Sequence, residues 1–74
     1  MKKLPQTNFC IGDNVKSKNP NDINTYTIED FVYSMNYNDW FVEYSYYNDV
    51  EDQNILTKDF NYFVKNMIKI SWKL

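Results

Sequence analysis

The stretch DWFVEYSYY, residues 39–47, decides the fold class of this chain. It places six aromatic or β-branched side chains in nine positions, a density typical of a β-strand. Between residues 40 and 46 the even positions are all apolar or aromatic, whereas the odd ones include Glu43 and Ser45. Such a period of two indicates a strand with one buried face. We therefore predict that the even-numbered side chains lie in the core and that Phe41 and Tyr47 face outward.

Other segments also have the pattern of strands. In residues 25–34, TYTIEDFVYS, the inward set shifts from even to odd positions across Glu29 and Asp30, which predicts a β-bulge. Shorter strands are expected in residues 12–18, GDNVKSK, and in residues 53–57, QNILT. A closing strand is expected from residue 67, and its predicted inward side chains are Ile68, Ile70, Trp72 and Leu74.

The segment between the last two of these strands has a helical pattern instead. Its apolar residues recur at helical spacing, with Thr57 as a possible cap and Asp59 in the first turn. We predict one or two helical turns, whose apolar stripe consists of Phe60, Phe63, Val64 and Met67.

This order of elements predicts a mainly β fold. Five short antiparallel strands with a short helical turn before the last strand match a five-stranded SH3-like barrel, which closes a small sheet and so limits exposed edges. An OB-type barrel fits less well, because its helix lies between the third and fourth strands. The 74 residues are expected to form one domain, with residues 1–8 as a disordered tail.

Composition argues against catalysis. The chain has no His, and Cys10, its single cysteine, therefore has no His to act as its base. Gly12 is the only glycine, so no Gly-rich phosphate loop exists. The acidic run Asp49, Glu51 and Asp52 lacks the glycine and bidentate glutamate of a calcium loop. We expect a protein that is not an enzyme and holds no cofactor or metal.

Composition also bears on the source and location of the protein. No apolar stretch is long enough to span a membrane or to serve as a signal peptide, so we expect a cytoplasmic protein that does not contact membranes. The eleven Asn and the absence of His, Arg and Ala indicate an AT-rich coding sequence. A low-GC bacterium, or a phage or mobile element that infects one, is the expected source.

The charges are segregated along the chain. Residues 21–57 contain eight acidic residues and no lysine, whereas both ends are basic. Two candidate surfaces follow from this layout. The first combines aromatic and acidic side chains, as peptide-binding grooves and methyl-lysine cages do, and consists of Tyr37, Asp39, Phe41, Glu43, Tyr47, Asp49 and Glu51. The second is a lysine strip on the first and last strands that would contact phosphates, and it consists of Lys16, Lys18, Lys69 and Lys73.

Several motifs resemble those of the small bacterial and phage SH3-like proteins of the YodC type. The resemblance covers residues 9–63 and is carried by IGDNVKSKN, TYTIEDF, DWFVEYSYY and ILTKDF. It implies an SH3-like barrel and no particular activity. The loop after Lys18 lacks the glycines of that family, and the strand beginning at Met67 extends beyond the end of many of its members.

These observations together predict a non-enzymatic protein-interaction module that uses the aromatic and acidic surface. Its small size suggests a phage- or mobile-element-encoded inhibitor of a host defence factor, acting in the host cytoplasm on a nuclease or nucleoprotein complex. The alternative is a small nucleic-acid-binding barrel that uses the lysine strip, although the sequence pI is only about 4.8 and arginine, the stronger phosphate ligand, is absent.

Overall fold

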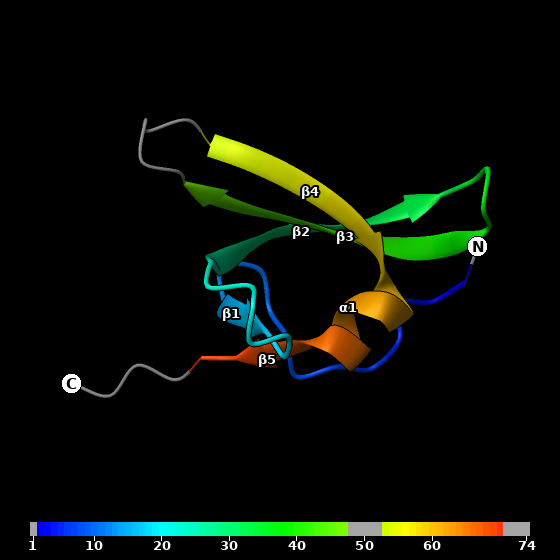
Figure 1. Ribbon diagram of the computed structural model, residues 1–74. Coiled ribbons are helices and arrows are strands. Elements are labelled where there is room, and N and C mark those ends of the chain that lie inside the picture. Colours follow the sequence, from blue (N-terminus) through cyan, green and yellow to red (C-terminus); the bar gives the residue numbers. More distant parts are fainter. Residues whose placement is uncertain (1, 48–52, 71–74) are drawn as a thin grey trace.

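The computed structural model describes residues 2–47 and 53–70, which form a single antiparallel sheet and one short helix. The strands are paired in the order β4-β3-β2-β1-β5, so the last strand returns to lie beside the first (Figure 1). The elements in chain order are β1 (Asn14–Ser17), β2 (Thr25–Ser34), β3 (Asp39–Tyr47), β4 (Gln53–Asp59), α1 (Phe60–Asn66) and β5 (Met67–Lys69).

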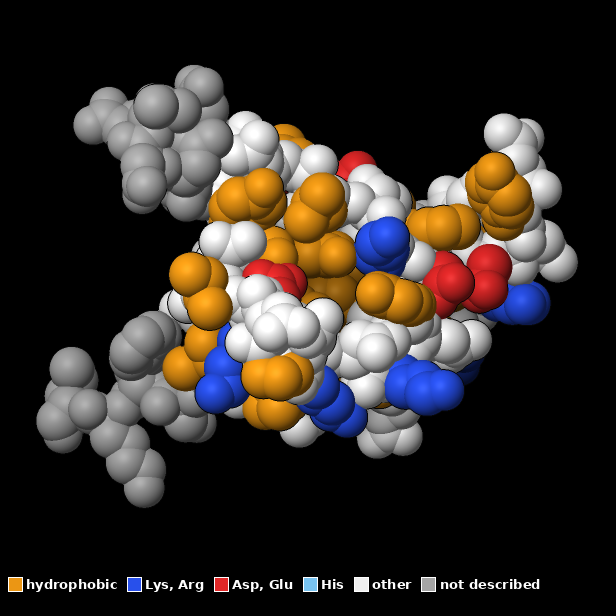
Figure 2. Space-filling view, viewed as in Figure 1, with side chains coloured by type: hydrophobic (Ala, Val, Ile, Leu, Met, Phe, Trp, Pro, Cys, Tyr) orange, Lys and Arg blue, Asp and Glu red, His pale blue; other side chains and the backbone are white. Residues whose placement is uncertain are grey.

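The predicted fold class is confirmed, with one difference. The molecule is mainly β, has five strands and carries its helix directly before the last strand. The sheet is barrel-like but does not close, because β4 and β5 remain at its two edges. Apolar side chains are visible in the hollow on the open side (Figure 2).

The bulge predicted in β2 is present. Ile28 is opposite Tyr44 and Asp30 is opposite Glu43, so Glu29 is the extra residue. An extra residue reverses which positions face inward. Ile28 is accordingly buried before the bulge, and Phe31 packs against the core after it.

The core lies on the inner face of the bent sheet, and its composition confirms the predicted period of β3. Val42 and Tyr44 are buried, and Trp40 and Tyr46 pack against the core from its margin. Edge-to-face and tilted ring contacts connect several of its aromatic side chains. The buried apolar residues are Phe9, Val15, Tyr26, Ile28, Val42, Tyr44, Phe60, Phe63 and Met67.

The segment before β1 contacts the sheet at two places. Phe9 is buried, and its ring meets the Phe63 ring edge-on with the centroids 5.4 Å apart. Nearer the start of the chain, the indole Nε1–H of Trp40 donates a hydrogen bond of 2.9 Å to the carbonyl oxygen of Lys2. Lys2 belongs to the segment predicted as a tail.

The helix α1 begins two residues later than the candidate cap Thr57 would place it. Strand β4 continues to Asp59, which is the N-cap. The Asp59 carboxylate accepts a hydrogen bond of 2.6 Å from the backbone N–H of Tyr62. Thr57 instead lies within β4, opposite Glu43.

The inward face of β5 differs from the prediction. Met67 is buried, whereas Ile68, predicted to face inward, is 42% exposed. The reason is that Met67 caps α1, its N–H bonding to the Phe63 carbonyl oxygen, and so continues the buried face of the helix into the strand. Val64, the fourth residue of the predicted stripe, is 38% exposed. Ile70 is half-buried, and the predicted inward residues Trp72 and Leu74 lie outside the described residues.

Candidate protein-interaction face

The outward face of the sheet formed by β2, β3 and β4 carries the aromatic and acidic residues. Phe41 is opposite Val32 of β2 and Asp59 of β4, and Glu43 is opposite Asp30 of β2. Directly opposite residues of antiparallel strands place their side chains on the same face. These five side chains therefore share the face that is turned away from the core.

A shallow apolar groove crosses this face at the end of the β2–β3 hairpin. Its volume is about 210 Å³, and the rings of Tyr37 and Phe41 lie beside it with their centroids 5.6 Å apart and their planes at 57°. Tyr37 is 75% exposed in the turn that connects the two strands, where Asn38 adopts a positive φ of 52°. We call this feature the aromatic groove, and it is lined by Val32, Ser34, Tyr37, Phe41 and Thr57.

Four acidic residues lie on the same face as the aromatic groove, and one of them, Asp59, also caps α1. We call them the acidic rim, and they are Asp30, Asp39, Glu43 and Asp59. Lys58, the nearest lysine along β4, is opposite Val42 and so belongs to the inner face. Its amine lies 5.2 Å from the centroid of the Tyr62 ring. The acidic rim is therefore not neutralised by β4.

Within the acidic rim, Asp30 and Glu43 are directly opposite each other across β2 and β3. Like charges at opposite positions of neighbouring strands destabilise a sheet. The ion pair found among the described residues joins Lys69 to Asp13, on β5 and before β1, and does not involve the rim. The repulsion between Asp30 and Glu43 would be relieved by a cation from outside the chain.

The bulged residue Glu29 adds a further carboxylate next to this face. Its Oε2 accepts a hydrogen bond of 2.5 Å from the hydroxyl of Ser45 and one of 3.4 Å from the amide of Gln53. Ser45 is only 2% exposed, although its position on β3 faces outward. Glu29 thus covers Ser45 and links three strands.

The structure brings together four of the seven residues predicted for a protein-binding surface, namely Tyr37, Asp39, Phe41 and Glu43. Tyr47 ends β3 with its backbone opposite Gln53, while its side chain, together with Asp49 and Glu51, lies outside the described part of the structure. The site also contains residues that the sequence prediction missed, namely Asp30, Val32, Ser34, Thr57 and Asp59. For those on β2, the bulge is the signal that could have found them.

Lys16 and Lys69 of the predicted lysine strip do not lie on the same face. Strands β1 and β5 are neighbours as predicted, but Lys16 is opposite Ile68 and Lys69 is opposite Val15. Successive positions alternate between faces, so Lys16 and Lys69 point to opposite sides. The amine of Lys69 is 3.2 Å from the Asp13 carboxylate and bonds to the Asn8 carbonyl oxygen at 3.0 Å.

Of the other two lysines of the strip, Lys18 lies two positions after Lys16, just beyond the end of β1. Its backbone N–H bonds to the Asn66 carbonyl oxygen at 2.9 Å. Lys73 lies outside the described residues. Lys69 and Lys16 lie on different faces because of the phase of β5. With Met67 facing inward, Lys69 points to the same side as Val15.

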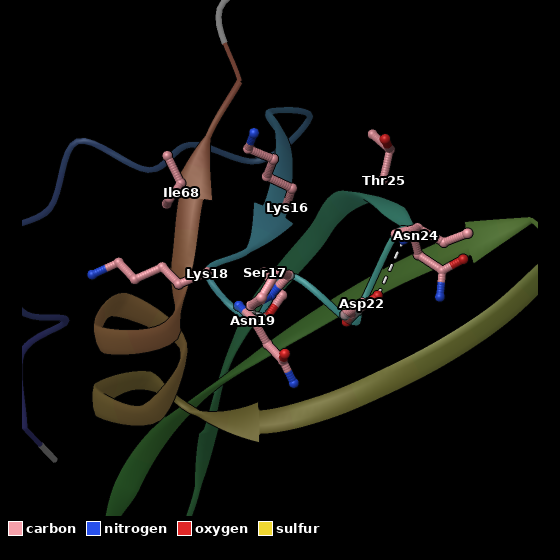
Figure 3. Close-up of a pocket in the computed structure, with 10 residues that line it drawn as sticks. Lys16, Ser17, Lys18, Asn19, Asp22, Asn24, Thr25 and Ile68 are labelled. Carbon is pink, nitrogen blue, oxygen red and sulfur yellow. Dashed lines mark hydrogen bonds between the residues drawn. The ribbon is translucent and has the colours of Figure 1, made fainter.

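A second groove, of about 490 Å³, lies between the loop after β1 and strand β5. Both Lys16 and Lys18 line it, and Figure 3 shows Lys18 directed away from Asp22. The Asp22 carboxylate accepts hydrogen bonds from the Tyr26 hydroxyl at 2.7 Å and from the Asn24 backbone at 3.1 Å. These bonds fix the loop to the sheet.

The perturbed titratable groups have structural explanations. A hydrogen bond of 2.8 Å from the Cys10 backbone N–H lowers the pKa of the Asp13 carboxyl. Burial raises the pKa of the Tyr26 and Tyr44 hydroxyls, that of Tyr44 to about 12. In residues 2–47 and 53–70 no three His, Cys, Asp or Glu side chains form a group able to hold a metal, and no helix is long and apolar enough to cross a membrane.

No family model, curated protein or solved structure matches this chain. The resemblance to YodC-type proteins therefore stays a prediction, and the function has to be inferred from the geometry of the face itself.

Proposed function

We propose that this protein is a non-enzymatic interaction module that binds a basic segment of another protein through the aromatic groove and the acidic rim. The observation that carries the proposal is the opposition of Asp30 and Glu43 beside the ring pair formed by exposed Tyr37 and half-buried Phe41. A lysine or arginine placed between the two carboxylates would relieve their repulsion. The adjacent rings offer a cation–π surface for the same kind of side chain.

The chemistry of this face also defines the partner. The two rings supply apolar contact area, and the carboxylates on the same face select for positive charge and speed association. Proteins that bind nucleic acid present such positive surfaces. The prediction that the protein is a phage- or mobile-element-encoded inhibitor of a host nuclease or nucleoprotein complex is compatible with this chemistry and stays a prediction.

The nucleic-acid alternative has less support. It requires a set of lysines on one face, whereas Lys16 and Lys69 point to opposite sides and Lys69 is paired with Asp13. The outward face of β2, β3 and β4 is acidic and would repel phosphates. We therefore carry forward protein binding alone.

Replacing Phe41 tests the proposal. The Phe41→Ser variant removes one ring of the aromatic groove, and we expect it to lose the proteins that the wild-type chain retains from a bacterial lysate. Because Phe41 lies outside the buried core, the melting temperature of the Phe41→Ser variant should differ little from that of the wild type. The matched control is Ile23→Ser, which removes an apolar side chain that is 91% exposed and does not line the aromatic groove.

The control variant should retain the same proteins as the wild type, and the captured bands should weaken as salt increases. Equal retention by Phe41→Ser and the wild type would remove the aromatic groove from the site. A large loss of melting temperature would instead assign Phe41 to the core. Retention of nucleic acid alone would favour the alternative function.

A further inference from the structure

Strand β4 lies at an edge of the sheet, with β3 as its one neighbour. It is seven residues long, and Figure 1 shows it along the upper side of the molecule, with no other helix or strand of the described residues beyond it. An edge strand presents unpaired backbone N–H and C=O groups that can pair with another chain. The opposite edge, β5, is only three residues long.

The hydrogen-bonding pattern of the sheet determines which backbone groups of β4 point to its free side. The pattern can be traced strand by strand from Ile28 in β2. The N–H of Ile28 donates to the Asp13 carbonyl oxygen at 3.0 Å, and its own carbonyl oxygen accepts from Gly12 at 2.8 Å. Both backbone groups of Ile28 therefore face toward the β1 side. Alternation then turns the backbone of Thr27 toward β3, where it is opposite Ser45.

The same alternation continues across β3. Because Ser45 bonds toward β2, its neighbour Tyr44 bonds toward β4, where it is opposite Leu56. The backbone of Leu56 is thus used within the sheet. The backbone groups of Ile55 and Thr57, on either side of it, point to the free edge, and no turn, loop or cap of the described residues bonds to them.

The edge has little of the protection found on natural edge strands. It contains no proline, and the amine of Lys58, its one lysine, lies over the Tyr62 ring on the inner side. Ile55, an apolar β-branched residue at its centre, is 61% exposed. Natural edges are shielded by charges, prolines, bulges or shortness, so a seven-residue edge of this composition is suited to pairing.

We propose that β4 pairs with β4 of a second copy of this chain, antiparallel and with the two-fold axis at Leu56. In this register Ile55 is opposite Thr57 of the second copy, and Asp59 is opposite Gln53. All seven residues of β4 pair with the second copy. The backbone groups that point to the free edge in one copy are opposite the free-edge groups of the other copy, and no two like charges are opposite each other. A two-fold axis at Ile55 or at Thr57 would shorten the overlap by two residues.

The pairing has a consequence for the arrangement of the interaction faces. Directly opposite residues share a face, so the outward sides of both copies would lie on the same side of one continuous sheet. The dimer would present two aromatic grooves side by side in an isologous arrangement. A partner with repeated basic segments would then bind with avidity.

The experiment is sedimentation velocity of the full chain over a wide range of concentration. We expect the 9.0 kDa monomer to convert to a species of twice that mass as concentration rises. The Ile55→Pro variant removes one outward N–H without touching the bonds between β3 and β4, and proline is tolerated on edge strands at such positions. It should remain a monomer with a native circular-dichroism spectrum, while Ile55→Thr, which keeps the N–H, should dimerise.

A second pair of variants tests the register. The double variant Ile55→Lys with Thr57→Lys places lysines opposite each other in both halves of the interface, and it should be monomeric. The double variant Ile55→Lys with Thr57→Glu places opposite charges there, and it should dimerise. This comparison also decides the matter if Ile55→Pro fails to fold.

Three outcomes would overturn the proposal. They are a wild-type chain that stays monomeric at every concentration, a folded Ile55→Pro variant that still dimerises, and charge variants that dimerise equally. All three outcomes are read from the mass of the chain without a basic partner. Because Thr57 lines the aromatic groove, binding of a basic partner is compared between the wild type and the Ile55→Pro variant only, so the two proposals can fail separately.

Discussion

Tyr44 places a titratable side chain in the aromatic core. Its side chain is 4% exposed, and its ring lies with its centroid 5.1 Å from that of Phe63 and 5.1 Å from that of Tyr26. Burial disfavours the phenolate and raises the pKa to about 12, from an ordinary value of 10.0. The folded chain therefore holds the Tyr44 hydroxyl proton more tightly than the unfolded chain does.

This shift predicts how stability depends on alkaline pH. Because the folded pKa lies above the unfolded one, the stabilisation is complete below pH 10 and is lost as pH rises toward about 12. Denaturant titrations between these values should show a falling free energy of unfolding for the wild type and a flatter profile for Tyr44→Phe. The control Tyr37→Phe, at a 75% exposed position, should follow the wild type. Equal slopes for all three chains would assign the alkaline loss to other groups.

The hairpin formed by β2 and β3 shows what alternation in a sequence can and cannot predict. The inward set of β3 and the bulge at Glu29 are local patterns of period two, and both are present. The outward positions of Phe41 and Glu43 follow from the same pattern. The bulge predicts that Asp30 also faces outward. Its pairing with Glu43, and that of Asp59 with Phe41, could not be predicted in this way, because register depends on where the bulge and the turns place each strand.

Strand β5 illustrates a second limit. Its alternation in sequence is clean, yet the buried side chain is Met67 and not Ile68. The end of α1 determines the phase, because the helix already directs Met67 into the core next to Phe63. Because the strand has only three residues, its pairing with β1 contributes less to the orientation of Met67 than the packing of the helix does. The lysine strip depended on the predicted phase, and for this reason Lys69 does not share a face with Lys16.

The opposed carboxylates of the hairpin predict a conflict between stability and binding. Replacing both, in Asp30→Asn with Glu43→Gln, removes a like-charge pair and should raise the free energy of unfolding by about 0.2–1 kcal/mol. The same variant should bind a lysine-rich protein segment more weakly, because the charge that attracts it is gone. Urea titration and fluorescence anisotropy with a lysine-rich peptide measure the two effects.

Salt provides the control for this comparison. High salt screens exposed charges, so the difference in stability between the double variant and the wild type should shrink as salt is added. A double variant that is less stable than the wild type would show that these carboxylates stabilise the hairpin. Unchanged affinity for the peptide would remove the pair from the interaction face.

At the scale of the whole molecule, the charge pattern of the sequence becomes a spatial one. The pairing of β1 with β5 brings the two basic ends of the chain together, and lysine side chains lie along the side of α1 and β5 (Figure 2). From the acidic middle of the chain, Asp30, Asp39 and Glu43 lie on the outward face of β2 and β3. The segregation could be predicted from the sequence because it depends only on which ends meet, whereas the individual positions depend on strand phase.

The chain is short, so its stability rests on a small shared core, and a single substitution tests this dependence. Val42 is fully buried and lies opposite Phe31 of β2 and Lys58 of β4. Val42→Asp would bury an unpaired charge, at a cost of several kcal/mol or more. Small domains are stable by only about 5–15 kcal/mol, and a chain of 74 residues belongs near the lower end. We expect the variant to lose the dispersed amide resonances of the folded protein in a proton–nitrogen NMR spectrum.

The matched control for this prediction is Ile55→Asp, which makes the same kind of change on the neighbouring strand at a position that is 61% exposed. It should keep the dispersed spectrum, because its carboxylate stays in water. Since strands from both ends of the sheet and α1 share one core, Val42→Asp should abolish their resonances together and not those of β3 alone. A Val42→Asp spectrum that kept the dispersed resonances of β1, β5 and α1 would show that the two halves of the sheet are stable independently. That result would contradict a single cooperative core.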